Sequence, residues 1–171
     1  KGLVVPTEYS QFFTRRTTIK EICCDLGQYV NEGDILAIAD IKATQEELTE
    51  LQASLDLLLK EHDINTPMHE LNTQIINTEK QGYLYVDDQD SAMECYEKLK
   101  LEDEDKYYDE QLYQYTIEYY NKEIAEARKL INEGTLRAKK SGYVTYVKDT
   151  SKSNSVGINE AVVVIADYDD Y

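Results

Sequence analysis

The chain has 171 residues, and its charge is strongly unbalanced, with 34 Asp and Glu against 18 Lys and Arg and a formal net charge of −16. So negative a chain repels phosphate groups, which excludes nucleic acid as a partner and disfavours direct binding to anionic membranes. The longest apolar run, residues 161–166, is far shorter than the roughly 20 residues that cross a bilayer. Because the first residue is Lys1 rather than Met, we interpret the chain as a piece of a longer protein and expect any membrane anchor to lie outside it.

Composition divides the sequence into three zones. Residues 1–40 and 134–171 combine β-branched and aromatic residues with turn residues, which is typical of strands. Residues 41–133 contain one glycine and one proline among abundant Glu, Lys, Leu, Gln and Ala, which predicts long helices. We therefore expect an α+β chain in which a helical zone separates a first β half from a second β half.

The helical zone carries two apolar stripes with steps of three and four residues, a spacing that is typical of coiled coils. The first stripe consists of Leu48, Leu51, Leu55 and Leu58, and the second of Tyr113, Ile117, Tyr120, Ile124, Ala127 and Ile131. Pairing them in one antiparallel register places the midpoint near Gln89, within the least helical stretch of the zone. The zone is therefore predicted to be an antiparallel coiled-coil α-hairpin with its tip near residues 81–90.

The outer half of this hairpin has a weaker pattern. Asn65, Thr66 and Pro67 interrupt the first arm, with Thr66 a candidate N-cap and Pro67 the first residue of a resumed helix. Residues 102–105 on the second arm are all acidic. We expect the outer half to be kinked, mobile or packed against another chain.

The two β zones repeat each other. Residues 30–40 and 156–167 both pass from an Asn-Glu turn into an apolar strand that ends in Ile-Ala-Asp. A duplicated half-motif that is split by an insertion favours two halves that close into one small sandwich. The two ends of the helical hairpin then leave this sandwich side by side.

The order of these motifs resembles the membrane fusion protein family, the periplasmic adaptor proteins of the HlyD type. Residues 19–40 resemble the first half of a biotinyl-lipoyl-like domain, and residues 136–144 (Leu-Arg-Ala-Lys-Lys-Ser-Gly-Tyr-Val) resemble the second half. Lys139 stands where this family usually has a proline. The resemblance covers residues 19–167 and implies a small split β-sandwich, or barrel-sandwich hybrid, that is interrupted by the α-hairpin.

The same resemblance implies a function as a non-catalytic adaptor of a membrane export machine. Such proteins bridge a membrane transporter, often of the ATP-binding cassette (ABC) type, to other envelope components through the hairpin, and they self-associate into rings. We therefore expect a membrane-anchored protein of the cell envelope that serves efflux or the secretion of proteins or peptides. This part of it is expected on the periplasmic or extracellular face.

Tyrosine, with 15 copies, supplies the candidate contact residues. Tyr113 and Tyr120 fit the seam between the two arms. Four others on the second arm cannot all face that seam: Tyr107, Tyr108, Tyr115 and Tyr119. Aromatic residues outside a two-helix seam favour contact with a neighbouring hairpin or a partner protein, with simple amphipathic surface and sugar binding as alternatives. At the tip, a small apolar cluster is predicted to touch a docking partner and consists of Tyr83, Leu84, Tyr85 and Val86.

No enzyme activity, cofactor or metal site is predicted. The sequence has no nucleophile near a histidine, no phosphate-binding glycine loop and no zinc-ligand spacing. His62 and His69 lie seven residues apart with Pro67 between them, unlike the i, i+4 pair that metal sites favour, so we interpret both as structural. Three cysteines are expected to be small buried apolar residues apart from one exposed thiol: Cys23, Cys24 and Cys95.

Two alternative functions belong to other classes. In a lipoyl or biotinyl carrier domain a lysine at the tip of a tight β-turn is modified, and residues 40–43 (Asp-Ile-Lys-Ala) faintly resemble such a turn. A helix that starts near Thr44, with Thr44 as its cap, argues against modification of Lys42. A structural coiled-coil spacer or scaffold protein is the other alternative, and it requires no sandwich built jointly by the two β zones.

Overall fold

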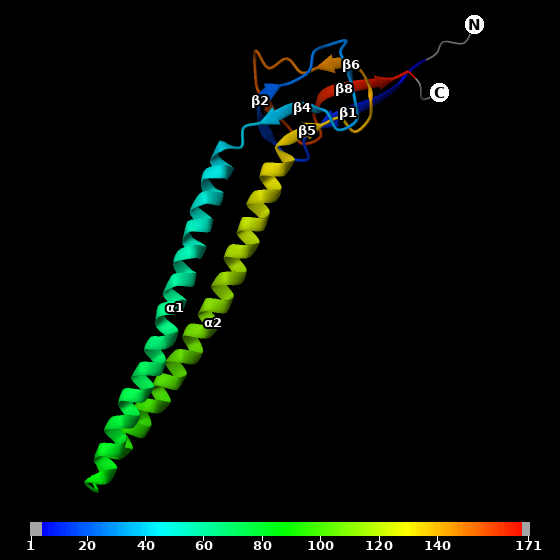
Figure 1. Ribbon diagram of the computed structural model, residues 1–171. Coiled ribbons are helices and arrows are strands. Elements are labelled where there is room, and N and C mark those ends of the chain that lie inside the picture. The colour runs from blue at the N-terminus through cyan, green and yellow to red at the C-terminus, as the bar shows by residue number, and fades with distance from the viewer. Residues whose placement is uncertain (1–4, 169–171) are drawn as a thin grey trace. The chain divides into compact units, whose positions relative to one another are not determined.

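A computed structural model of the chain describes residues 5–168, so the outermost residues of both predicted β zones, 1–4 and 169–171, lie outside the described residues. The first β zone forms β1 (Thr7–Phe12), β2 (Thr17–Ile22), β3 (Tyr29–Val30) and β4 (Ile35–Ala39). The helices α1 (Lys42–Tyr85) and α2 (Gln89–Glu133) follow (Figure 1). The second β zone forms β5 (Thr135–Arg137), β6 (Gly142–Val147), β7 (Ser155–Val156) and β8 (Ala161–Asp167). The chain forms two compact units, a β-sandwich with the adjoining helix ends and the outer hairpin of residues 49–125.

The β-sandwich is built jointly by the two β zones, as the repeated half-motif predicted. Its two four-stranded sheets have the strand orders β1-β8-β6-β3 and β5-β4-β2-β7, with antiparallel pairing throughout. Each sheet therefore takes strands from both zones. Exchanging β2 for β6, β3 for β7 and β4 for β8 converts one order into the other, with β1 and β5 in equivalent places. The sandwich is thus a duplicated unit whose halves interleave.

The core of the sandwich lies between the two sheets and is almost entirely apolar. Leu36, Val162 and Ile165 are fully buried, and each such side chain stabilises the fold by roughly 1.5–3 kcal/mol. The exception is Gln11, which is 1% exposed and whose Oε1 accepts a hydrogen bond from the Lys139 N–H at 3.3 Å. A proline at position 139 has no N–H to donate, so Lys139 has a structural role in this chain.

The two ends of the helical insertion lie side by side at the sandwich, as predicted. The Ala39 N–H donates to the Gly134 carbonyl oxygen at 2.7 Å, next to the antiparallel pairing of β4 with β5. Helix α1 begins at Lys42, whose N–H donates to Asp40 Oδ1 at 3.2 Å. The predicted cap at Thr44 is therefore wrong, because the Asp40 carboxylate satisfies a free N–H group two residues earlier.

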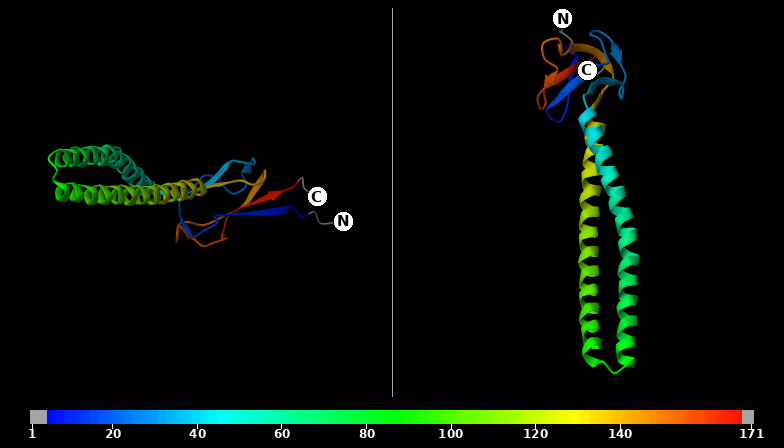
Figure 2. Two further views of the ribbon diagram at one scale, coloured as in Figure 1. Left: turned by 90° about the horizontal axis from the view of Figure 1, so that it is seen from below. Right: turned by 90° about the vertical axis from the view of Figure 1, so that its left-hand side faces the viewer.

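Helices α1 and α2 form an antiparallel hairpin (Figure 2), which confirms the predicted fold class. The seam between them continues further outward than the predicted stripes, because Ala92 and Cys95 near the start of α2 are 2% and 1% exposed. With Cys24 also buried and Cys23 exposed, the expected environments of the three thiols are confirmed.

The predicted break of the first arm at Pro67 is wrong, because α1 is continuous through this residue. A proline inside a helix leaves the carbonyl group four residues earlier, here that of Asp63, without its usual partner and costs about 3 kcal/mol. Thr66 and His69, close to Pro67 in the sequence, are half-buried. Helix α1 bends along its length, whereas α2 is straighter (Figure 2).

The turn at the tip has a regular helix-ending geometry. Asp88 N–H donates to Tyr83 O at 2.9 Å and Asp87 N–H to Leu84 O at 3.2 Å, the bond pattern of a Schellman motif. Asp87 has the left-handed φ of 59° that this motif requires. Asp88 then caps α2 by accepting the Ser91 N–H at 3.1 Å. Residues 81–85 are therefore helical, and the predicted midpoint, Gln89, is already the first residue of α2.

Candidate partner-binding surfaces of the hairpin

The tip cluster, defined as Tyr83, Leu84, Tyr85 and Val86, is exposed. Tyr85 is 92% and Val86 is 67% exposed, while Tyr83 and Leu84 are 39% and 36% exposed. The first three residues belong to the last turn of α1, and Val86 begins the connection to α2. Because the Schellman motif fixes the backbone here, the cluster presents apolar side chains on a rigid turn. Its contact with a partner stays a prediction.

Helix α2 has a second apolar stripe on the side away from the seam, here named the outer stripe of α2. Tyr115 and Tyr119 each follow a seam residue by two positions, which is about 200° around a helix with 3.6 residues per turn. The stripe has steps of seven, four, three and four residues and 50–71% exposure, and it consists of Leu101, Tyr108, Leu112, Tyr115 and Tyr119. Tyr107, the remaining predicted contact residue, lies beside it, with its ring in edge-to-face contact with Tyr108 at 5.6 Å.

Helix α1 has a matching stripe that the sequence analysis missed, here named the outer stripe of α1. It consists of Leu57, Ile64, Met68, Leu71 and Ile75, which are 49–60% exposed. The same steps of seven, four, three and four residues recur, and again each member follows a seam position by two residues. The same spacing in the sequence is the signal that identifies this stripe, which lies beyond the predicted seam positions that end at Leu58.

The two outer stripes lie at the same level of the hairpin and on its opposite edges. His62 of α1 contacts Glu110 of α2 and stacks on Tyr113, with ring centroids 3.6 Å apart. His69 contacts Asp109. These contacts place residues 57–75 beside residues 101–119. Because each stripe faces away from the shared seam, the hairpin is an elongated body with two apolar edges.

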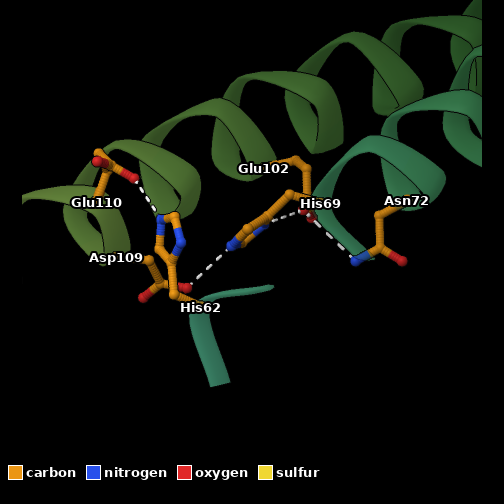
Figure 3. Close-up of polar contacts among 6 residues, drawn as sticks. All are labelled: His62, His69, Asn72, Glu102, Asp109 and Glu110. Carbon is orange, nitrogen blue, oxygen red and sulfur yellow. Dashed lines mark hydrogen bonds and ion pairs between the residues drawn. The ribbon is translucent and has the colours of Figure 1, made fainter. Parts of the chain in front are cut away.

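A polar cluster interrupts the seam at this level (Figure 3). His69 lies between two carboxylates, with Nδ1 2.6 Å from Glu102 Oε1 and Nε2 2.9 Å from Asp109 Oδ2. The side chains of His69 and Glu102 are each 15% exposed. His62 Nε2 lies 2.9 Å from Glu110 Oε2. We name these five residues the histidine layer; both histidines were expected to be structural, but their carboxylate partners on α2 were not foreseen.

Two groups of the histidine layer have shifted pKa values. Hydrogen bonds to Glu102 and then to Asp109 raise the pKa of His69 above its ordinary value of 6.5. Hydrogen bonds from Gln114 and then from His62 lower the pKa of Glu110. Both directions favour the charged forms of His69 and Glu110, so the layer places charged groups within an otherwise largely apolar seam.

The structure also bears on the predictions for cofactors and membrane contact. Within residues 5–168, no three His, Cys, Asp or Glu side chains are arranged to hold a metal ion. Lys42 is the first residue of a helix and pairs with Glu46 at 3.7 Å, in contrast to the turn position of a carrier lysine. Neither long helix contains an apolar stretch that could span a bilayer in this part of the chain.

Comparison with known proteins identifies the architecture. No family model matches the sequence, and no curated protein matches it significantly. Among solved structures, the periplasmic adaptor protein EmrA matches with a TM-score of 0.57 and 14% identity, over 94% of this chain and 72% of that chain. MacA from Actinobacillus actinomycetemcomitans matches with a TM-score of 0.62 and 16% identity, over 95% of this chain and 54% of that one. The fold is that of the periplasmic adaptor proteins.

A third adaptor fold supports this result. The soluble domain of LipC, a membrane fusion protein of a type I secretion system, matches over 94% of this chain and 99% of that chain, with a TM-score of 0.52 and 11% identity. The resemblance to periplasmic adaptor proteins that the sequence predicted is thus confirmed for the fold. This chain spans 54% of MacA and 40% of a putative efflux transporter from Bacteroides eggerthii, so it corresponds to part of these longer proteins.

Proposed function

We propose that this chain is the non-catalytic hairpin-bearing part of an adaptor in a membrane export machine that serves efflux or the secretion of proteins or peptides. The observation that carries the proposal is the sandwich that the two β zones build jointly on either side of a long hairpin insertion, in a fold shared with EmrA, MacA and LipC. A spacer protein needs no such joint sandwich. The hairpin carries no reacting groups in this proposal, and the machine's energy comes from its pump.

The whole protein bridges a membrane transporter, such as an ABC pump, to other envelope components. It is anchored in the membrane through a segment outside this chain, with the hairpin on the periplasmic or extracellular face. The tip cluster is the docking contact for the next component of the machine, because it combines the 92% exposed Tyr85 with a rigid turn.

The two outer stripes support self-association into a ring. The stripe on α1 is aliphatic and the stripe on α2 is rich in tyrosine, so the two edges of the hairpin differ. Packing of the α1 edge of one copy against the α2 edge of the next is a heterologous contact, which produces closed rings or open arrays rather than twofold dimers. Since both stripes lie at one level, neighbouring hairpins pack parallel and without stagger.

Disulfide crosslinking in cells that produce the full-length protein tests this assembly. In a Cys23→Ser background, Met68→Cys combined with Tyr108→Cys joins the two stripes at one level of neighbouring copies. We expect a ladder of crosslinked species larger than a dimer in the double variant. Each single variant should remain uncrosslinked, because the proposed contact brings no stripe against itself.

Several outcomes would contradict the proposed ring or the proposed docking at the tip. Dimers from the single variants, or the absence of a ladder in the double variant, contradict the proposed ring. A matched variant with all four tip-cluster residues replaced by Ser separates the two surfaces, because it should retain the ladder while export falls. Export that is unaffected by the four Ser substitutions contradicts docking at the tip.

A further inference from the structure

His69 bridges Glu102 and Asp109 of α2, and this bridge requires a particular protonation state of the imidazole ring. An ionised carboxylate only accepts hydrogen bonds, and His69 faces Glu102 from one ring nitrogen and Asp109 from the other. Both nitrogens must therefore carry a proton, so the bridge needs the charged imidazolium. A neutral imidazole has a single N–H and directs a nitrogen lone pair at one of the two carboxylates.

We propose that the histidine layer makes the hairpin respond to pH, so that mildly acidic conditions hold α1 and α2 together at the level of the two outer stripes and alkaline conditions loosen them. The response belongs to the seam itself and needs no partner. Its consequence for assembly rests on the proposed function, because a looser seam changes the spacing of the two apolar edges through which neighbouring copies pack.

Other charged groups near the two histidines belong to both helices. From α2, Glu102, Asp109 and Glu110 contact the rings directly, and Lys106 lies among them along the helix. From α1, Glu61 and Glu70 are sequence neighbours of the two histidines, and Asn72 donates to Glu102 at 3.4 Å. Acidic groups outnumber Lys106, so the surroundings favour a protonated His69.

The sign of the effect follows from the raised pKa of His69. A group whose pKa is higher in the folded chain contributes stability that is fully present below its unfolded value. This contribution is lost as the pH rises through the folded value. The lowered pKa of Glu110 acts at acidic pH. The stability that Glu110 contributes is present above its ordinary pKa and is lost as the pH falls through its pKa in the folded chain. The seam is therefore most stable in mildly acidic solution.

Proton NMR of the 171-residue chain tests the protonation state. The chain has two histidines, so a His62→Gln variant assigns the remaining ring signal to His69. We expect this signal to titrate at a higher pH in the folded chain than in the same chain unfolded in urea. A folded midpoint equal to or below the unfolded one overturns the proposal.

Urea unfolding followed by circular dichroism tests the effect on the seam. Between about pH 6 and 8.5, where histidine loses its proton, the urea midpoint of the natural chain should fall. Asp109→Asn should reduce this fall, whereas Asp56→Asn, which removes one acid from the exposed Lys60–Asp56 pair, should leave it unchanged. His69→Gln should abolish it. An unchanged slope in both His69→Gln and Asp109→Asn contradicts the proposal.

Crosslinking of Met68→Cys to Tyr108→Cys, quenched at each pH, reads out the consequence for assembly. We expect the ladder to weaken as the pH rises and to become insensitive to pH when His69→Gln is added. A ladder that is absent at every pH contradicts the proposed assembly while the urea and NMR results still decide the pH response. A ladder that is equally strong at every pH contradicts the link between the seam and assembly.

Discussion

Individual polar residues determine features of this chain that apolar periodicity does not address. Gln11 is buried in the sandwich and binds the Lys139 N–H, and Asp87 takes the left-handed conformation that ends α1. Neither role is visible in the sequence, because both depend on backbone groups that come together only in the fold. The exposed tyrosines, in contrast, were predictable, since their positions fall outside the seam spacing.

At Asp87 we expect glycine to stabilise the hairpin. Glycine adopts φ of +59° without a steric penalty, so Asp87→Gly should raise the free energy of unfolding by roughly 0.5–1 kcal/mol. Urea unfolding measured by circular dichroism provides the comparison. Asp87→Ala is the matched control, because it removes the same charge but keeps a Cβ atom. It should not stabilise, and equal stabilisation by both variants would assign the effect to charge instead.

At the scale of elements, the hairpin and the sandwich followed from spacing and repetition, but their boundaries did not. A seam of repeating apolar positions defines the register only to about one helical turn, which is why Gln89 was predicted as the midpoint and is in fact the start of α2. The first strand, β1, was not predicted individually, because its partner β8 lies at the other end of the chain. A helix break was predicted at Pro67 from local propensity alone, whereas α1 continues through this residue because tertiary packing can override local propensity.

The cost of Pro67 is measurable. Pro67→Ala restores an N–H that can donate to the Asp63 carbonyl oxygen. It also raises the conformational entropy of the unfolded chain, which offsets part of the gain. We expect the free energy of unfolding to rise by about 2 kcal/mol, together with a gain in helical circular dichroism. Met68→Ala at the neighbouring exposed site serves as the control and should change stability little. A loss of stability in Pro67→Ala would indicate that the bend in α1 is needed for seam packing.

At the scale of the whole molecule, most of the excess charge belongs to the outer hairpin. Residues 49–125 contain 19 acidic and 6 basic residues, a net charge of −13 out of −16. Like charges on two adjacent helices repel each other and oppose both the folding of the hairpin and the proposed lateral association of hairpins. The apolar seam and the outer stripes must therefore supply the attraction that the charges oppose.

This repulsion predicts a dependence on salt. Raising NaCl from about 10 to 200 mM shortens the screening length from roughly 30 Å to under 10 Å. The urea midpoint of the hairpin should rise, and its free energy of unfolding should increase by roughly 1 kcal/mol. The same series on a variant with residues 103–105 replaced by Gln and Asn should show a smaller gain. A midpoint that falls with salt would mean that attractive ion pairs, such as those of the histidine layer, outweigh the repulsion.

The hydrogen bond from Ala39 to Gly134 joins the chain just before the helices begin to the chain just after they end. The sandwich is therefore closed by its own backbone, and nothing in that closure depends on how many residues intervene. Seven residues added to each arm extend the rod by about 10 Å without altering a single strand pairing. The length of the hairpin is thus an independent variable in this architecture, and the same sandwich can carry hairpins of different length.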